Sequence, residues 1–196
     1  AVSFGVPFDK GEVFPENKLR LSAESGEDIP IDTWTLAYWP DGSVKWGGIA
    51  GVIPAGTEKL TLEKAVKKSK AKSKLPDTDK KKSVSVTETS QGIHISTGAI
   101  SAYIPRQGEF LIDSLLYKGV KVGGKARLIC HTQSEPVLES TSQVSFTNYI
   151  GELKSVTVER AGSVRALVKL EGVHKSPKGR EWLPFVVRLY FYGGSE

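Results

Sequence analysis

The segment from Trp34 to Trp46 holds three of the four tryptophans and is built around a strong turn signal. Pro40 presets φ for the first corner of a type I turn, Asp41 suits the second corner, and Gly42 can adopt the left-handed conformation that closes a three-residue loop. The segment therefore predicts a β-hairpin, which commits this part of the chain to antiparallel sheet structure.

Side-chain alternation divides this hairpin into two faces. One face is strongly apolar and suited to a core, and it comprises Trp34, Leu36, Tyr38, Val44 and Trp46. Trp39 lies on the other face, beside Asp41 and Lys45, where a tryptophan is harder to explain as core. We expect Trp39 to pack under a neighbouring loop, and a ligand or interdomain contact is the alternative.

The rest of the chain repeats short β-favouring runs between turn signals. Residues 1–63 contain five or six such runs, the spacing typical of a small barrel or sandwich. The same pattern of short β-favouring runs continues after residue 82, for example at residues 92–96 and 164–170, which contain β-branched side chains. No ten-residue window carries an amphipathic helical stripe. The sequence therefore predicts an all-β fold.

The net charge of +5 comes almost entirely from one segment. Residues 64–82 carry nine lysines and two aspartates, a net +7, which leaves −2 for the rest of the chain. The segment has no apolar periodicity and no aromatic residue on which a base could stack, so we expect a solvated linker and no nucleic-acid partner. It divides the chain into two β units, residues 1–63 and 83–196.

Composition and motifs narrow the functional classes further. Cys130 is the single cysteine, so no internal disulfide can form, and its apolar neighbours predict a buried thiol and not a nucleophile. No stretch approaches the ~18 apolar residues of a membrane span, and the chain does not open with a basic and apolar signal segment. A nucleophile elbow, a glycine-rich phosphate loop and a cysteine or histidine cluster are all missing from the sequence, so no cofactor or metal is predicted.

Candidate acid–base residues are dispersed along the chain. His94, His131 and His174 form no pair with metal-ligand spacing, and each is expected to be a surface or structural histidine. His94 lies between Ile93 and Ile95, so its ring is expected to project from the face opposite two core residues.

Cationic residues near the end of the chain are candidates for one shared strand face. The set comprises Arg165, Lys169 and Arg188, accompanied by Tyr190 and Tyr192. We expect these to be ordinary solvent-exposed strand charges. The final run, residues 182–192, is apolar on both faces, which calls for neighbours on both sides and leads us to expect a chain cut from a longer protein.

Four motifs carry a family resemblance that covers nearly the whole chain. They are residues 5–11 (Gly-Val-Pro-Phe-Asp-Lys-Gly), 36–46, 98–108 and 183–195. In this order they resemble the N-terminal part of the rhamnogalacturonan exolyase family, which also includes YetA-like proteins. Asp9 stands where many relatives have proline, and the linker is unusually rich in lysine, but neither departure affects the fold that the resemblance implies.

The resemblance implies a small N-terminal barrel-like β domain at residues 1–63, a lysine-rich linker at 64–82, a central β-sandwich domain at 83–196 that is incomplete here, and a catalytic α/α toroid further on. The chain would then be the non-catalytic N-terminal portion of a secreted or periplasmic lyase acting on pectin, bracing a C-terminal catalytic domain of the same protein.

The alternative hypothesis is a free-standing carbohydrate-binding or adhesion module. Its candidate sugar-contacting residues are Trp39, Asp41 and Lys45. Neither hypothesis places a catalytic residue in this chain, and neither requires a cofactor, a metal ion, a nucleic acid or a membrane.

Overall fold

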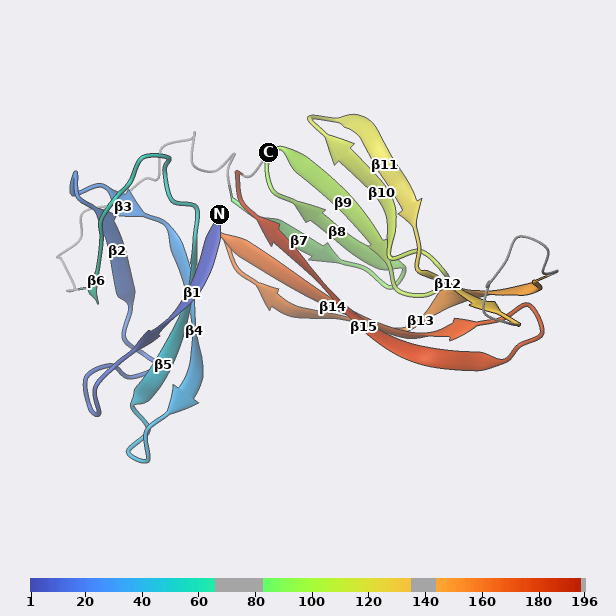
Figure 1. The fold of residues 1–196 in the computed structure, drawn as a ribbon. Coiled ribbons are helices and arrows are strands. Elements are labelled where there is room, and N and C mark those ends of the chain that lie inside the picture. The colour runs from blue at the N-terminus through green and yellow to red at the C-terminus, as the bar shows by residue number, and fades with distance from the viewer. Residues whose placement is uncertain (66–82, 135–143, 195–196) are drawn as a thin grey trace.

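A computed structural model describes residues 1–65, 83–134 and 144–194, and these form two β units (Figure 1). The described residues form strands and contain no helix, so the all-β prediction is confirmed. Consistently, no described segment offers a helix that could cross a membrane. Of the predicted linker, Lys64 still belongs to a strand, and residues 66–82 lie outside the described residues.

The N-terminal unit consists of two small antiparallel sheets around a compact core. One sheet has the order β1-β5-β4 and the other the order β3-β2-β6. The strands are β1 (Val2–Pro7), β2 (Leu19–Ala23), β3 (Asp28–Ile29), β4 (Ile31–Tyr38), β5 (Val44–Gly51) and β6 (Leu60–Lys64). Leu21, Ile29 and Ile49 are buried between the sheets, together with Val13 and Val44.

The predicted hairpin is formed by β4 and β5. Gly42 has φ of 83°, and the Trp39 N–H donates to the Ser43 carbonyl at 2.8 Å, which closes the three-residue loop as the sequence indicates. The Asp41 carboxylate accepts hydrogen bonds from both the backbone N–H and the hydroxyl of Ser43. The three-residue turn predicted from Pro40, Asp41 and Gly42 is therefore present in the structure.

The prediction that the apolar face of this hairpin is core is wrong for three of its residues. Leu36, Tyr38 and Trp46 are 58%, 59% and 42% exposed, whereas Val44 is buried. The pairing register of β4 against β5 shifts twice between Thr35 and Tyr38, and alternation in the sequence does not show which face of the sheet meets the core.

The central unit is a sandwich of a five-stranded and a four-stranded sheet, drawn in Figure 1 in green to yellow and in dark yellow to red. The first sheet has the order β11-β10-β9-β8-β7 and the second the order β12-β13-β14-β15. The strands are β7 (Ser85–Glu88), β8 (Gly92–Ser96), β9 (Ile100–Pro105), β10 (Ile112–Tyr117), β11 (Val120–Ala126), β12 (Ile129–Gln133), β13 (Phe146–Ala161), β14 (Arg165–Lys175) and β15 (Glu181–Tyr192).

Alternation along the strands fills the space between these two sheets. Ile93 and Ile95 of β8 are buried in a core cluster that also contains Val168 and Leu170 of β14. His94 lies between the two isoleucines and is exposed on the outer face, as the sequence predicts. The sandwich therefore has one apolar interior and two outer faces that can carry function.

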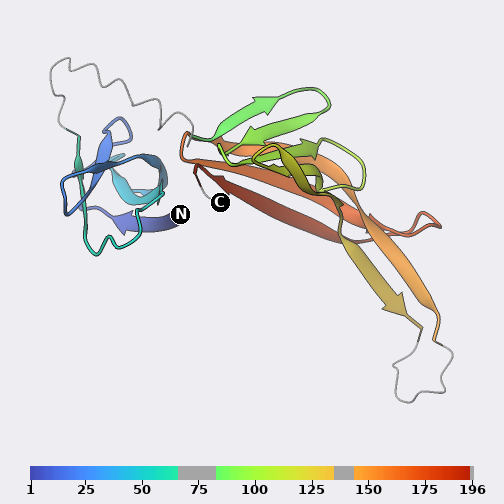
Figure 2. The ribbon, with the colours of Figure 1, turned by 90° about the horizontal axis from the view of Figure 1, so that it is seen from above.

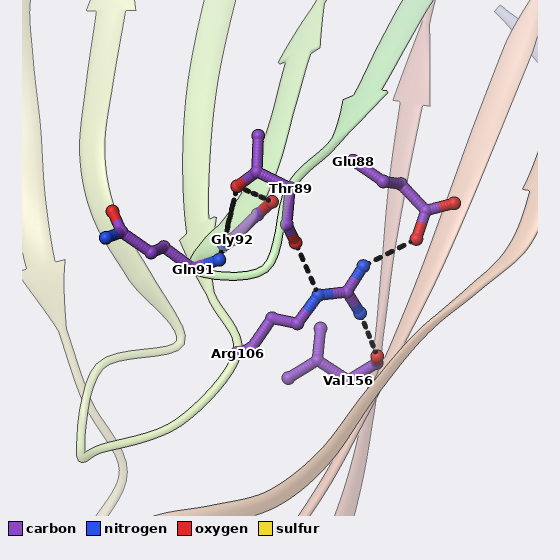
Figure 3. A network of polar contacts seen from close by, with 6 residues as sticks. All are labelled: Glu88, Thr89, Gln91, Gly92, Arg106 and Val156. Atoms are coloured by element: carbon purple, nitrogen blue, oxygen red, sulfur yellow. Dashed lines mark hydrogen bonds and ion pairs between the residues drawn. The ribbon is translucent and has the colours of Figure 1, made fainter.

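Arg106, in the loop after β9, ties the two sheets together (Figure 3). Its guanidinium donates to the Val156 carbonyl on β13 at 3.0 Å and to the Thr89 carbonyl in the β7–β8 turn at 2.9 Å. The same side chain forms an ion pair with Glu88 at 2.7 Å. Since three groups converge on one planar cation, the β7–β8 turn is held in a fixed position.

Candidate functional site

The two β units meet where β4 approaches the turn between β13 and β14 (Figures 1 and 2). The Asp32 carboxylate on β4 accepts hydrogen bonds from the backbone N–H groups of Ser163, Val164 and Arg165, at 3.1, 2.8 and 2.7 Å. Hydrogen bonds to an ionised acceptor are stronger than those between neutral groups. One carboxylate from the first unit thus satisfies three donors of the second.

Gly162 is what allows this carboxylate to come so close. A Cβ atom built at Gly162 would lie 2.0 Å from Asp32 Oδ2, well inside any allowed contact. The absence of a side chain at this position is therefore a requirement of the contact between the two units.

Two arginines of the second unit cover an aromatic ring of the first. The guanidinium carbons of Arg165 and Arg160 lie 4.1 and 4.7 Å from the ring centroid of Trp34. Arg165 is 5% exposed, and its Nη1 donates to the Ser3 hydroxyl at 2.8 Å. Burial lowers the pKa of Arg160, the positive charge of Arg165 lowers it further, and Asp32 opposes both effects.

We call this set of residues the interdomain clamp: Ser3, Asp32, Trp34, Arg160, Gly162, Ser163, Val164 and Arg165. Its cations are balanced partly by the Asp32 carboxylate and partly by the face of Trp34. The clamp gives the two units a defined contact.

An exposed apolar patch adjoins the clamp on the same face of the N-terminal sheet. Gly5 and Gly48 are direct partners, and the Trp34 ring lies over Gly48. A Cβ atom at Gly5 would contact Trp46 at 3.5 Å and Leu36 at 3.7 Å, which places these side chains beside Trp34. Tyr38, two residues after Leu36 in β4, is also exposed, and we call Leu36, Tyr38 and Trp46 the apolar patch.

The cationic strand residues predicted to share a face do so on the outer side of β14 and β15, but the expectation that they are solvent-exposed is wrong for Arg165, which is buried against Trp34. Lys169 and Arg188 are direct cross-strand partners, and Arg165 lies 5.4 Å from the ring of Tyr190. Tyr192 is the cross-strand partner of Arg165.

Two of these cations are matched by neighbouring carboxylates. Arg188 binds both oxygens of Glu159, at 2.8 and 3.0 Å, and its hydrogen bond is the largest cause of the lowered pKa of Glu159. Lys169 pairs with Glu171 at 3.0 Å. These charges therefore form local pairs on a strand surface.

The predicted sugar-contacting residues lie together at the β4–β5 turn. Trp39 is half-buried, its indole N–H donates to the Phe8 carbonyl at 3.0 Å, and Lys45 Nζ lies 4.6 Å from its ring centroid. Hydrogen bonds from the Ser43 side chain and then from its backbone N–H lower the pKa of Asp41. Trp39 thus packs against a neighbouring segment, as expected, and sugar binding by these three residues stays a prediction.

We expect Trp39→Ala to lower the thermal midpoint of unfolding, because the substitution leaves the Phe8 carbonyl without its donor and removes half-buried ring surface. The expected loss is ~2 kcal/mol. Tyr38→Ala, which removes a largely exposed ring, is the matched control and should change the midpoint little. Weaker binding of rhamnogalacturonan fragments by Trp39→Ala, with an unchanged midpoint, would instead make Trp39 a sugar platform.

The three histidines lie in separate environments. His131 Nδ1 lies 2.6 Å from Asn148 Oδ1, and His174 Nδ1 lies 2.7 Å from the Leu183 carbonyl oxygen. The ring of His94 lies against that of Tyr103, with centroids 4.5 Å apart. Within the described ranges, no three His, Cys, Asp or Glu side chains are grouped to hold a metal ion. Cys130, predicted to be buried, is only half-buried.

The clamp was not found by sequence reasoning. Asp32 and the residues it binds are more than 130 positions apart in the chain, and Asp32 stands in a strand with no motif around it. The conspicuous cluster of tryptophans directed the prediction to Trp39, whereas Trp34 makes the contact between units.

Comparison with protein families agrees with this architecture. Residues 1–65 match the PcRGLX-like N-terminal RIFT barrel domain, and residues 84–196 match the PcRGLX-like protein central beta sandwich domain. The chain belongs to the PcRGLX-like family, and it is thereby related to rhamnogalacturonan lyases. The family resemblance and the barrel-then-sandwich order expected from the sequence are confirmed.

A curated relative is the uncharacterized protein YetA of Bacillus subtilis (strain 168). The two sequences are 33% identical over 194 residues, which cover 98% of this chain and 22% of YetA. The chain thus spans less than a quarter of the length of the relative that it matches.

Proposed function

We propose that this chain is the non-catalytic N-terminal portion of a polysaccharide lyase-like protein that acts on rhamnogalacturonan, and that its two β domains brace a catalytic domain carried by another part of the protein. The observation that carries the proposal is the clamp, because Asp32 joins the two domains at a contact flanked by exposed apolar side chains. A joined pair of domains with an uncovered apolar patch is suited to supporting a further domain.

The distribution of polar groups supports a non-catalytic role. Elimination at a uronate requires a group that neutralises the carboxylate and a base near the reacting proton, both within ~3 Å of the substrate. The three histidines lie apart, and the Arg188 and Lys169 side chains are each engaged by a carboxylate. The proposal accordingly assigns both catalytic groups to another part of the protein, and it places the protein outside the cytoplasm, secreted or periplasmic, where pectin is encountered.

A lyase assay on the purified chain tests the proposal. Incubation with rhamnogalacturonan should give no rise in the absorbance of the unsaturated uronate product, because among the described residues the three histidines lie apart and the Arg188 and Lys169 side chains are held by carboxylates. Steady product formation that disappears in His94→Ala, His131→Ala or His174→Ala would refute the non-catalytic assignment. The same preparation should be checked for a cooperative unfolding transition, so that inactivity is measured on folded protein.

The second candidate is a free-standing carbohydrate-binding or adhesion module. The position of Trp39, Asp41 and Lys45 together at the tip of the hairpin favours it, because a tryptophan offers a large apolar ring beside polar groups that could bond sugar hydroxyls. The two proposals differ in whether Trp39 binds sugar. A brace has little affinity for sugar at Trp39, whereas a module of this kind loses sugar binding when Trp39 is replaced.

A further inference from the structure

The outer face of the five-stranded sheet carries a groove that no part of the proposed bracing role uses. Its volume is about 490 Å³, within the range of about 300–1,000 Å³ common for small-molecule sites. The groove runs over β7, β8, β9 and β10, on the outer face of the sheet that carries the exposed His94.

Strand pairing arranges the lining of this groove in two parallel rows. Residues that are directly opposite in neighbouring strands share a face, so each row crosses four strands. The first row is Thr87, His94, Tyr103 and Ser114, and the second is Ser85, Ser96, Ser101 and Leu116. Six of these eight side chains carry a hydroxyl group and one carries an imidazole.

Four of the six hydroxyl groups in these rows are available to bind a ligand. Among the described residues, the hydroxyls of Thr87, Ser101, Tyr103 and Ser114 make no hydrogen bond to protein. No described residue that lines the groove bears a carboxylate or an amine. The groove thus offers hydroxyl donors and acceptors without a fixed charge, which matches the surface of a sugar.

Tyr103 and His94 supply an aromatic platform within the first row. Their ring centroids are 4.5 Å apart with an interplanar angle of 31°. Tyr103 extends over Gly92, where a Cβ atom would lie 2.4 Å from the ring, so the glycine allows the ring to lie across the sheet. Apolar C–H surface of a sugar ring packs well against such a platform.

The platform is held in place from below. Gly92 begins β8 directly after the β7–β8 turn, where the Thr89 hydroxyl accepts a hydrogen bond from the Gly92 N–H and donates one to the Gly92 carbonyl. Arg106 binds the same turn through the Thr89 carbonyl and anchors it to β13 (Figure 3). A site that is rigid before binding loses less entropy when it captures a ligand.

We propose that this groove binds a short oligosaccharide, with one sugar ring over Tyr103 and His94 and its hydroxyls bonded to the serine and threonine rows. A docked protein is the less suitable occupant, since serine is depleted at the centre of protein–protein interfaces. The apolar patch formed by Leu36, Tyr38 and Trp46 has the composition that protein docking requires, and it lies on the other unit. The oligosaccharide site is independent of the bracing role.

Titration calorimetry of the complete 196-residue chain with a rhamnogalacturonan hexasaccharide tests this site, with cellohexaose and xylohexaose as comparison sugars. We expect saturable binding of at least one of the three. Tyr103→Ala should weaken it about tenfold, because the platform is lost, whereas Tyr103→Phe should stay within about threefold. Tyr190→Ala removes an exposed ring on the opposite sheet and is the matched control.

A second variant guards against misfolding of Tyr103→Ala. Ser101 is exposed in the second row, so Ser101→Arg should fill the groove without disturbing the core. Its unfolding midpoint should match that of the unmodified chain while sugar binding is lost. Absence of saturable binding to all three sugars, or equal losses in Tyr103→Ala and Tyr190→Ala, would overturn the site. Either result leaves the lyase assay and its outcome unaffected.

Discussion

Replacing Asp32 with alanine is expected to uncouple the two β domains. The substitution removes the acceptor of three backbone N–H groups and the negative charge that offsets the repulsion between Arg160 and Arg165. Hydrogen bonds to charged groups contribute ~1.5–3 kcal/mol each and are not additive, so we expect a total loss of ~3–4 kcal/mol. Urea unfolding followed by tryptophan fluorescence measures this loss.

Two further variants make the Asp32 result specific. Gly162→Ala, on the other side of the contact, should cause a similar loss of stability, because the new Cβ atom would displace the Asp32 carboxylate. Asp28→Ala removes an exposed carboxylate that pairs with Arg20 on the surface of the same domain, and it should change stability by ~0–1 kcal/mol. An Asp32→Ala chain as stable as Asp28→Ala would show that the clamp contributes little.

Gly48→Ala is expected to destabilise the N-terminal domain by ~3 kcal/mol, at the upper end of overpacking effects. A Cβ atom at Gly48 would lie 2.1 Å from the Trp34 ring, and that ring cannot move away freely because Arg165 and Arg160 lie over it. The collision should therefore both strain β5 and loosen the clamp. Chemical denaturation and amide exchange at Arg165 report the two effects.

Gly5 provides the matched control for Gly48, since the two glycines are direct partners in the same sheet. A Cβ atom at Gly5 meets Trp46 at 3.5 Å, an ordinary contact. Gly5→Ala should thus be neutral or slightly stabilising, by up to ~0.5 kcal/mol. Equal destabilisation by both substitutions would mean that loss of glycine, and not collision with Trp34, is responsible.

Local signals in the sequence were sufficient to predict the hairpin and the alternating strands. The Pro40–Gly42 turn forms as expected because its three residues each favour the required backbone conformation. The burial of Ile93 and Ile95 around an exposed His94 follows from strand periodicity alone. These features depend on neighbours within a few positions, which a single sequence displays.

Features that depend on register or on distant contacts were not predictable in this way. The sequence shows β-favouring runs at residues 144–146 and 155–159, but β13 is one strand of 16 residues, continued through two bulges. Leu36 and Trp46 share a face with Trp34, as alternation indicates, but the sequence does not show which face of the sheet meets the core, and Leu36 and Tyr38 are exposed. The clamp and the groove bring together residues from separate strands, and the spacing of these residues in the sequence does not predict that they are in contact.

The clamp and the groove lie in different parts of the molecule, and we expect substitutions in them to have different effects. Substitutions at Asp32 should alter the coupling between domains, and substitutions at Tyr103 should alter sugar binding. Because no described residue is shared by the two sets, their effects should be additive. The Asp32→Ala chain is therefore expected to retain the sugar affinity of the groove.

Pulsed electron paramagnetic resonance between spin labels on the two domains tests most directly whether the clamp makes them one brace. Labels at Glu16→Cys and Lys178→Cys, both exposed positions, would be introduced after Cys130→Ser removes the native thiol. We predict a single narrow distance distribution that broadens markedly when Asp32→Ala is added. A broad distribution that Asp32→Ala leaves unchanged would contradict the account, because the two domains would then move independently with the clamp intact.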